Sequence, residues 1–200
     1  MLKFEIKIPL YKKEYECLKA FSHNEKASNY HINYYYDSDK YEMDKLDITC
    51  SIRESNGSFT SSLKAHQDKK SECSIYYAVK ASRNNDTALF QSIDVKYQGH
   101  LITYRTMFLS CNGLKVYFDK NFYLNTIDYE LEISYLPECK EQADHFLVFL
   151  SKVLYNLKII SEPNELNKRR GITDCKSKRF MNRKKEIERK IKNNKYLINL

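Results

Sequence analysis

The feature that most constrains the fold of this chain is a strict alternation of charged and apolar side chains along several short segments. Residues 2–8 show it first, with charges at Lys3, Glu5 and Lys7 and large apolar groups between them. Successive side chains of a β-strand point to opposite faces, so this segment is predicted to be a strand with one charged and one apolar face. The same alternation recurs at residues 48–53, 59–64, 115–119 and 128–133. The charged face points either outward to solvent or inward into a polar interior, and the alternation alone does not decide between them.

Strand-forming residues dominate most of the chain up to residue 134. Seven further segments rich in Tyr, Ile, Val, Phe and Thr bring the number of predicted strands to eight; they cover residues 32–38, 47–54, 58–66, 74–82, 100–110, 114–120 and 127–134. Asn56-Gly57 and Asn112-Gly113 are typical of hairpin turns, which indicates a largely antiparallel sheet. Apolar residues at helical spacing predict two helices, near residues 11–22 and 138–157. The predicted fold class is α+β and mainly β, with eight antiparallel strands that can close into a barrel and with flanking helices.

The net charge of +8 comes entirely from the last forty residues. Residues 1–160 hold 21 Lys and Arg against 21 Asp and Glu, whereas residues 161–200 hold 13 against 5. We therefore predict a barrel domain at 1–160 and a basic helical tail at 161–200, with the boundary near Pro163. A predicted helix in the tail has Phe180, Ile187 and Ile191 on one side. This helix packs its apolar side on the domain or, as an alternative, residues 168–195 contact RNA or another acidic partner.

The composition argues against several classes of protein. No apolar run is long enough to span a bilayer, and the charges of the first segment do not fit a signal peptide, so a cytoplasmic protein is expected. The six cysteines lie 23 to 38 residues apart without a Cys-x-x-Cys pair, which indicates buried thiols rather than disulfides or a zinc site. The histidines also lack metal-ligand spacing; they are His23, His31, His66, His100 and His145.

The kinds of charge on the alternating strands suggest a function. Glu130 and Glu132 stand two residues apart on one face, where they repel each other unless a cation lies between them. We therefore expect Mg²⁺ or Mn²⁺ as a cofactor. Cations on four separate strands would suit a polyphosphate if those strands converge around it; they are Lys7, Arg53, Lys64 and Arg105.

Four segments, taken in order, resemble a known family. They are FEIK at residues 4–7, NYYYDSD at 33–39, TCSIRESNGSFTSSLKAH at 49–66 and VYFDKNFYLNTIDYELEISY at 116–135. In this order they resemble the bacterial CYTH-domain proteins, which are triphosphate tunnel metalloenzymes, over roughly residues 1–158. The resemblance implies a closed eight-stranded antiparallel barrel whose charged face points inward and binds a triphosphate together with a divalent metal.

The resemblance also implies roles for particular residues. Glu5, Glu130 and Glu132 would hold the metal and act in catalysis, and Tyr35 stands where some members have a tyrosine linked to proton transfer. The expected substrate-binding residues are Lys7, Arg53, Lys64, Arg105, Lys115 and Lys120.

Two positions depart from the family pattern, because Lys3 replaces a metal-side glutamate and Ser51 replaces a phosphate-binding arginine. The lysine is expected to weaken metal binding, unless it points out of the barrel end or binds phosphate itself. Replacing the arginine removes one charge-assisted contact to phosphate, which is worth about 1.5 to 3 kcal/mol.

The activity implied by the resemblance is divalent-metal-dependent hydrolysis of inorganic triphosphate or of a small organic triphosphate inside the tunnel. Two alternatives remain. One is adenylate cyclase-like conversion of ATP, and the other is a degenerate barrel that binds polyphosphate or a nucleotide without turnover. The departures at Lys3 and Ser51 favour the second alternative, because each weakens the expected binding of metal or phosphate.

Overall fold

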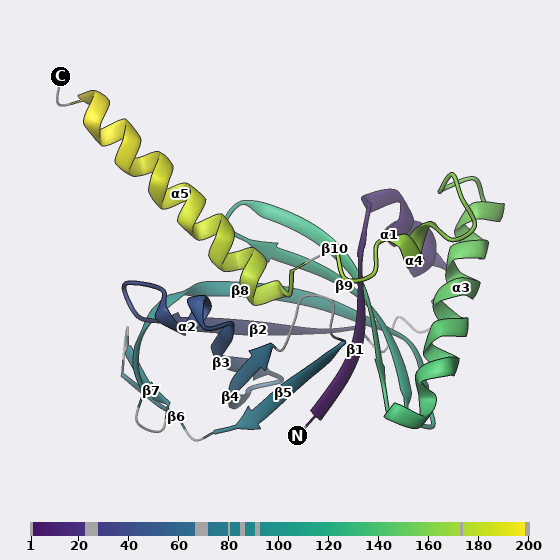
Figure 1. Cartoon of the computed structure of the whole chain (residues 1–200), viewed down its shortest axis with the longest axis horizontal. Coiled ribbons are helices and arrows are strands. Elements are labelled where there is room, and N and C mark those ends of the chain that lie inside the picture. Colours follow the sequence, from purple (N-terminus) through teal and green to yellow (C-terminus); the bar gives the residue numbers. More distant parts are fainter. Residues whose placement is uncertain are drawn as a thin grey trace.

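The computed structural model describes residues 2–22, 28–66, 72–79, 81–84, 87–90, 93–172 and 174–198 of the 200-residue chain. Within these residues, ten strands form one antiparallel sheet (Figure 1). The strands are β1 (Leu2–Leu10), β2 (Ser28–Asp37), β3 (Ile48–Ser55), β4 (Ser58–His66), β5 (Cys73–Ala78), β6 (Ala81–Asn84), β7 (Thr87–Phe90), β8 (Ile93–Cys111), β9 (Leu114–Tyr123) and β10 (Thr126–Tyr135).

Eight of these strands form a closed ring. Their order around the ring is β2-β3-β4-β5-β1-β10-β9-β8, and the pairing of β2 with β8 closes it. The remaining two strands, β6 and β7, continue the sheet from the first part of β8. The predicted antiparallel eight-stranded barrel is therefore confirmed.

The strand boundaries differ most from the prediction between residues 73 and 99. The predicted strand 74–82 is divided between β5 and β6, and β8 begins at Ile93 rather than at residue 100. The early part of β8 was missed because Gly99 looks like an interruption of a strand. Here Gly99 has a φ of +133° and lies where the pairing register of β2 and β8 shifts. Both predicted hairpins are present, with positive φ at Asn56, Gly57 and Gly113 as such turns require.

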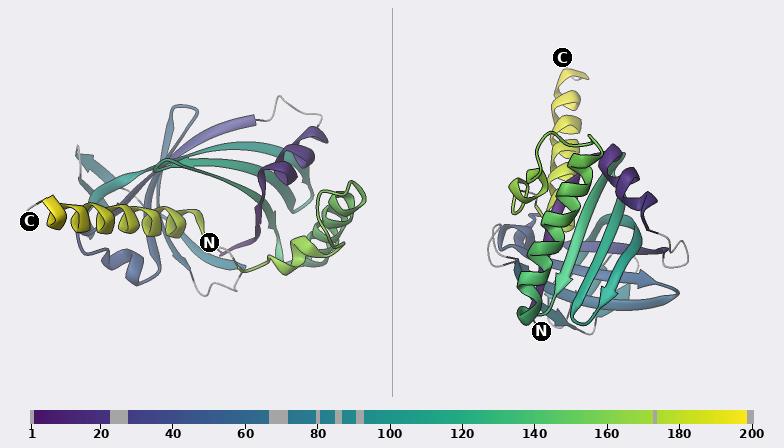
Figure 2. Two further views of the ribbon diagram at one scale, coloured as in Figure 1. Left: turned by 90° about the horizontal axis from the view of Figure 1, so that it is seen from above. Right: turned by 90° about the vertical axis from the view of Figure 1, so that its right-hand side faces the viewer.

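The largest apolar core lies between the barrel wall and two helices. Helix α1 (Lys12–Ala20) and helix α3 (Lys140–Asn156) match the two predicted helices, and Figure 2 shows α3 across the outside of the strands. Their side chains Leu18, Leu147 and Leu150 join apolar residues of β1, β9 and β10 in this core, namely Ile6, Ile8, Val116, Phe118, Leu131 and Ile133. Because these residues face the helices, the residues that alternate with them face the barrel interior. The inward orientation of the charged face is therefore confirmed.

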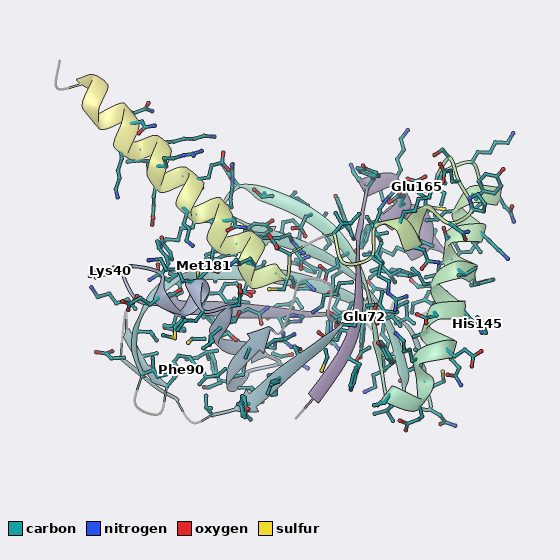
Figure 3. All side chains as sticks on the ribbon, in the orientation of Figure 1. Lys40, Glu72, Phe90, His145, Glu165 and Met181 are labelled. Carbon is teal, nitrogen blue, oxygen red and sulfur yellow. The ribbon has the colours of Figure 1, made fainter. Side chains whose placement is uncertain are left out.

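Two short helices complete the described structure: α2 (Glu42–Lys45) lies between β2 and β3, and α4 (Glu165–Lys168) precedes the last helix. This last helix, α5 (Lys176–Ile198), projects away from the barrel (Figures 1 and 2). Its first part is packed, because Phe180 and Met181 are buried in a cluster with Tyr35, Leu101 and Tyr123 of the barrel wall. Figure 3 labels Met181 at the end of α5 next to the barrel. Farther along the helix, Ile191 is exposed. Contacts with the rest of the protein continue as far as Glu188, whose carboxylate accepts a hydrogen bond of 2.7 Å from the Tyr41 hydroxyl.

Two expectations from composition can also be compared with the structure. The structure places Cys111 on the surface and buries only Cys50 among the six cysteines, so the expectation of buried thiols holds for one residue. None of the described helices combines enough length with enough apolar character to cross a membrane.

Candidate active site

A cavity of about 920 Å³ lies inside the barrel. The residues that line it include two carboxylates, those of Glu5 and Glu132, and six cations, an excess of four positive charges. The cations are Lys7, Arg53, Lys64, Arg105, Lys115 and Lys176. A concave surface with an excess of one sign of charge concentrates ions of the opposite sign, so this cavity favours an anionic ligand.

Three carboxylates gather where strands β9 and β10 meet the cavity. Asp119 and Glu130 are opposite each other across the two strands, and Glu132 lies two residues farther along β10 on the same face. One oxygen of each side chain lies within 4.8 Å of the others, and all three residues are buried. Carboxylate oxygens are the ligands that Mg²⁺ and Mn²⁺ prefer, so the donor set fits such an ion. We call Asp119, Glu130 and Glu132 the acidic cluster.

An ammonium group from helix α5 lies within the acidic cluster. Lys176 Nζ is 2.6 Å from Asp119 Oδ2, 2.7 Å from Glu130 Oε1 and 3.5 Å from Glu132 Oε2. One turn later, Arg179 donates a hydrogen bond of 2.8 Å from Nη1 to Glu130 Oε2. The basic tail therefore supplies charge to the interior of the barrel, where two of its cations neutralise buried carboxylates.

The barrel wall supplies a third cation to the acidic cluster. Arg105 on β8 donates to both oxygens of Asp119, at 2.8 Å from Nε and 2.6 Å from Nη2. The same Nη2 lies 2.9 Å from Glu132 Oε2, and the guanidinium group is 4.3 Å from the centre of the Tyr117 ring. This two-point geometry fixes the orientation of the guanidinium plane, which a lysine could not achieve.

Ion pairing keeps two members of the acidic cluster, Glu130 and Glu132, charged. Burial on its own would raise the pKa of Glu130, but the positive charges of Lys176 and Arg179 lower it to about 2. Burial likewise opposes ionisation of Glu132, and Arg105 with Lys176 holds its pKa well below the ordinary value. For Lys176, burial favours the neutral amine, yet the three carboxylates raise its pKa above the ordinary value. At neutral pH Glu130 and Glu132 are therefore ionised, and Lys176 carries its charge.

A second group of charges, on β1 and β4, forms the basic side of the cavity. Glu5 Oε2 accepts hydrogen bonds from Lys7 Nζ at 2.6 Å and from Lys64 Nζ at 3.1 Å. Burial and the neighbouring charge of Lys7 lower the pKa of Lys64, although Glu5 partly offsets them. Besides burial, the positive charge of Lys7 thus contributes to the lowered pKa of Lys64, and a bound anion would offset that repulsion.

Glu5 is therefore placed differently from the expectation of a metal ligand. Its carboxylate is engaged by Lys7 and Lys64, and these charges hold its pKa below the ordinary value in spite of burial. Among the described residues, Asp119 rather than Glu5 completes the acidic cluster with Glu130 and Glu132.

Three further predicted residues lie on the cavity wall. Arg53 is exposed and donates from Nε to Asn33 Oδ1 at 2.8 Å, and Lys115 is also exposed. The ring of Tyr35 packs against Phe180 of α5, with 5.1 Å between the ring centres. Burial raises the pKa of Tyr35, so its hydroxyl group stays protonated at neutral pH.

The remaining positions of interest lie away from this set. Lys120 is not brought together with the other cations, because its Nζ lies 4.9 Å from the centre of the Phe122 ring, on the face of β9 opposite to Asp119. Ser51 lines the cavity and its hydroxyl is 3.2 Å from that of Ser62. The side chain of Lys3 lies outside the described part of the structure, although its backbone pairs with Ser74.

Sequence reasoning missed Lys176 and Arg179, and it did not assign Asp119 a role in metal binding. Asp119 carried a usable signal, since it lies on the same face of its strand as Lys115 and Tyr117. The two tail residues carried none, because a lysine at the start of a basic helix looks the same in sequence whether it is solvated or buried.

Comparison with family models gives no match, and comparison with curated proteins gives none either. Solved structures do match. A candidate adenylate cyclase from Bacillus halodurans superposes with a TM-score of 0.61 at 21% identity, over 89% of this chain and 96% of that one. The PH1819 protein from Pyrococcus horikoshii superposes with a TM-score of 0.51 at 18% identity, over 80% and 92% of the two chains. These two likenesses show that the chain shares its overall fold with both proteins.

Proposed function

We propose that this chain binds a triphosphate in the barrel cavity and hydrolyses its terminal phosphoryl group with the help of a divalent cation. The observation that carries the proposal is the arrangement of charge around one cavity. Six cations and two carboxylates line its wall, and one of these carboxylates, Glu132, belongs to the buried acidic cluster. A triphosphate needs the first feature for binding, and a divalent cation needs the second.

The residues divide into two groups by chemistry. Lys7, Lys64, Arg53, Arg105 and Lys115 would neutralise the phosphate oxygens, and Glu5 would hold Lys7 and Lys64 side by side. Asp119, Glu130 and Glu132 would hold Mg²⁺ or Mn²⁺. Bound there, the ion would polarise the phosphoryl oxygens and lower the pKa of the attacking water. The proposal assigns no role to Lys120, and it leaves Tyr35 as a protonated wall residue.

Inorganic triphosphate or a small organic triphosphate is the preferred substrate. The cavity proposed to bind the phosphates has a volume of about 920 Å³, which is large enough for a triphosphate. ATP is the natural comparison, because the similar Bacillus halodurans protein is a candidate adenylate cyclase. Cyclisation of ATP would release pyrophosphate rather than phosphate, so the products distinguish the two reactions.

The test is release of phosphate from inorganic triphosphate and from ATP, with Mg²⁺ and with Mn²⁺, by the natural protein and by Glu130→Gln. We expect metal-dependent turnover that Glu130→Gln loses by about 100-fold or more, because one ligand of a catalytic cation is weakened. Glu138→Gln changes an exposed glutamate and should keep the natural rate. Turnover that survives Glu130→Gln would contradict the assignment of the cluster.

A second candidate is a barrel that binds polyphosphate without turnover. The observation that favours it is the position of Lys176, whose ammonium group already neutralises the acidic cluster. Binding of triphosphate without phosphate or pyrophosphate release under any metal condition would establish this candidate. We also propose that the protein works in the cytoplasm, which the wide spacing of its six cysteines favours.

A further inference from the structure

Lys176 occupies the place that a cation would take in the acidic cluster. Its Nζ lies 2.6 Å from Asp119, 2.7 Å from Glu130 and 3.5 Å from Glu132, so one ammonium group contacts all three carboxylates. We propose that Lys176 is a built-in competitor of the divalent cation, and that the cation binds the cluster only when Lys176 leaves it. This inference rests on the proposed function, because it assumes that the cluster is a metal site.

Geometry makes the two occupants mutually exclusive. The three carboxylate oxygens lie within 4.8 Å of one another, and a divalent ion requires oxygens at about 2.0 to 2.6 Å. An ion at that distance from Asp119 and Glu130 would overlap the position of Nζ, which lies at hydrogen-bond distance from the same two residues. Two positive groups this close in a buried site would also repel each other strongly.

The lysine is held in the cluster by the docking of its helix. Phe180 and Met181 are buried against the barrel, and Arg179 pairs with Glu130. Lys178 binds Asp44 and Asp47 on the α2 side, at 3.1 Å in each case. Several contacts thus fix the first turns of α5, and the position of Lys176 follows from them.

Because competition is a coupling between two binding events, it acts in both directions. Docking of Lys176 lowers the affinity of the acidic cluster for the cation. Binding of the cation weakens the docking of α5 by the same factor. Couplings of this kind are roughly 5- to 150-fold. The tail would therefore set the concentration of divalent cation that the barrel needs.

The test is titration calorimetry with Mn²⁺ alone on the full-length natural protein and on Lys176→Met, which keeps the length of the side chain and removes its charge. We expect Lys176→Met to bind Mn²⁺ roughly 5- to 150-fold more tightly than the natural protein. Lys178→Met is the matched control, since it removes a docking contact of the same helix outside the acidic cluster, and it should bind Mn²⁺ less tightly than Lys176→Met does. Glu130→Gln should weaken binding in either background.

The outcomes separate this inference from the proposed function. Equal Mn²⁺ affinity of the natural protein and Lys176→Met, lost from both with Glu130→Gln, would overturn the competition and leave the metal site in place. Absence of Mn²⁺ binding to both proteins would overturn the metal site and the competition together. Tighter binding by Lys176→Met supports the competition whatever the turnover assay gives.

A second measurement uses only the natural protein, in case Lys176→Met does not fold. Saturating Mn²⁺ should accelerate hydrogen–deuterium exchange of the backbone amides at the start of α5, because docking of the helix is weakened. The amides of helix α3 provide the internal reference. Exchange at the start of α5 that stays unchanged or slows with Mn²⁺ would overturn the competition.

Discussion

Phe180 lies directly over the backbone of Gly99, so that a Cβ atom at position 99 would be 2.6 Å from Phe180 Cζ. Gly99 also has a φ of +133°, a conformation that side chains rarely allow. This contact joins helix α5 to strand β8 at the point where the register of β2 and β8 shifts. Glycine is therefore required here for two reasons: the backbone has a positive φ, and the ring of Phe180 packs directly on it.

Gly99→Ala should destabilise the protein more than a glycine change elsewhere. A side chain at positive φ costs about 1 to 2 kcal/mol, and crowding against Phe180 should add about 1 to 3 kcal/mol. Gly57→Ala is the matched control, because Gly57 has a φ of +74° but nothing within 4 Å of the added Cβ. The free energy of unfolding, measured in urea, checks this. Equal losses for the two variants would show that Phe180 moves aside without cost.

Arg105→Met should lower the free energy of unfolding by about 3 to 5 kcal/mol, because it leaves the buried carboxylate of Asp119 short of a partner. Adding Asp119→Asn should recover part of this loss, since the uncompensated charge is then gone. A double-mutant cycle in urea measures the coupling, and the exposed Lys115→Met serves as the control, with an effect within about 0.5 kcal/mol. If the two changes had additive effects on the free energy of unfolding, the ion pair of Arg105 and Asp119 would not contribute to stability.

The stability of the protein should fall as the pH falls below about 6.5, in part because of His31. Burial, helped by the charges of Arg53 and Arg105, lowers the pKa of His31 from 6.5 to about 2. Below about pH 6.5 the unfolded chain therefore binds a proton at His31 that the folded protein does not bind. This difference lowers the free energy of unfolding by about 1.4 kcal/mol per pH unit. In His31→Gln, the free energy of unfolding should depend less steeply on pH between pH 6.5 and pH 4.5 than in the natural protein. An unchanged dependence would mean that His31 is protonated in the folded state.

Triphosphate should raise the melting temperature of the natural protein. The increase should be much smaller for Lys64→Met. Lys64 lies in the cavity, where loss of a charge-assisted contact should cost about 1.5 to 3 kcal/mol of binding energy, or roughly ten- to a hundredfold in affinity. Lys120→Met removes the same charge from the outer face of β9 and should keep the natural response. Equal responses of the two variants would place the anion outside the barrel.

The barrel could be predicted because its strands carry an alternating pattern of charged and apolar residues. The pattern is strong where one face meets α1 and α3 and the other meets the cavity, as at Ile6 and Lys7. The hairpin of β6 and β7 was missed because strands of four residues are too short to show a period. Local patterns thus predicted the ring and missed its extension.

The site could be predicted only in part. Positions on the wall follow from strand register, so the sequence could predict that Lys7, Lys64, Arg105 and Glu132 share the barrel interior, where they line one cavity. The pairing of Lys176 with Asp119 joins residues 57 positions apart, on a helix and a strand whose relative placement depends on the whole fold. No periodicity in the sequence encodes such a contact, and the resemblance drawn from residues 1–158 did not reach it.

The counter-charge of the buried carboxylates is carried by α5 and not only by the wall of the barrel. A change in the length or sequence of the segment before Lys176 can therefore shift the charge balance of the cavity while every strand stays intact. Evolution could tune the proposed binding of a divalent cation, or abolish it, by substitutions in a segment that takes no part in the sheet.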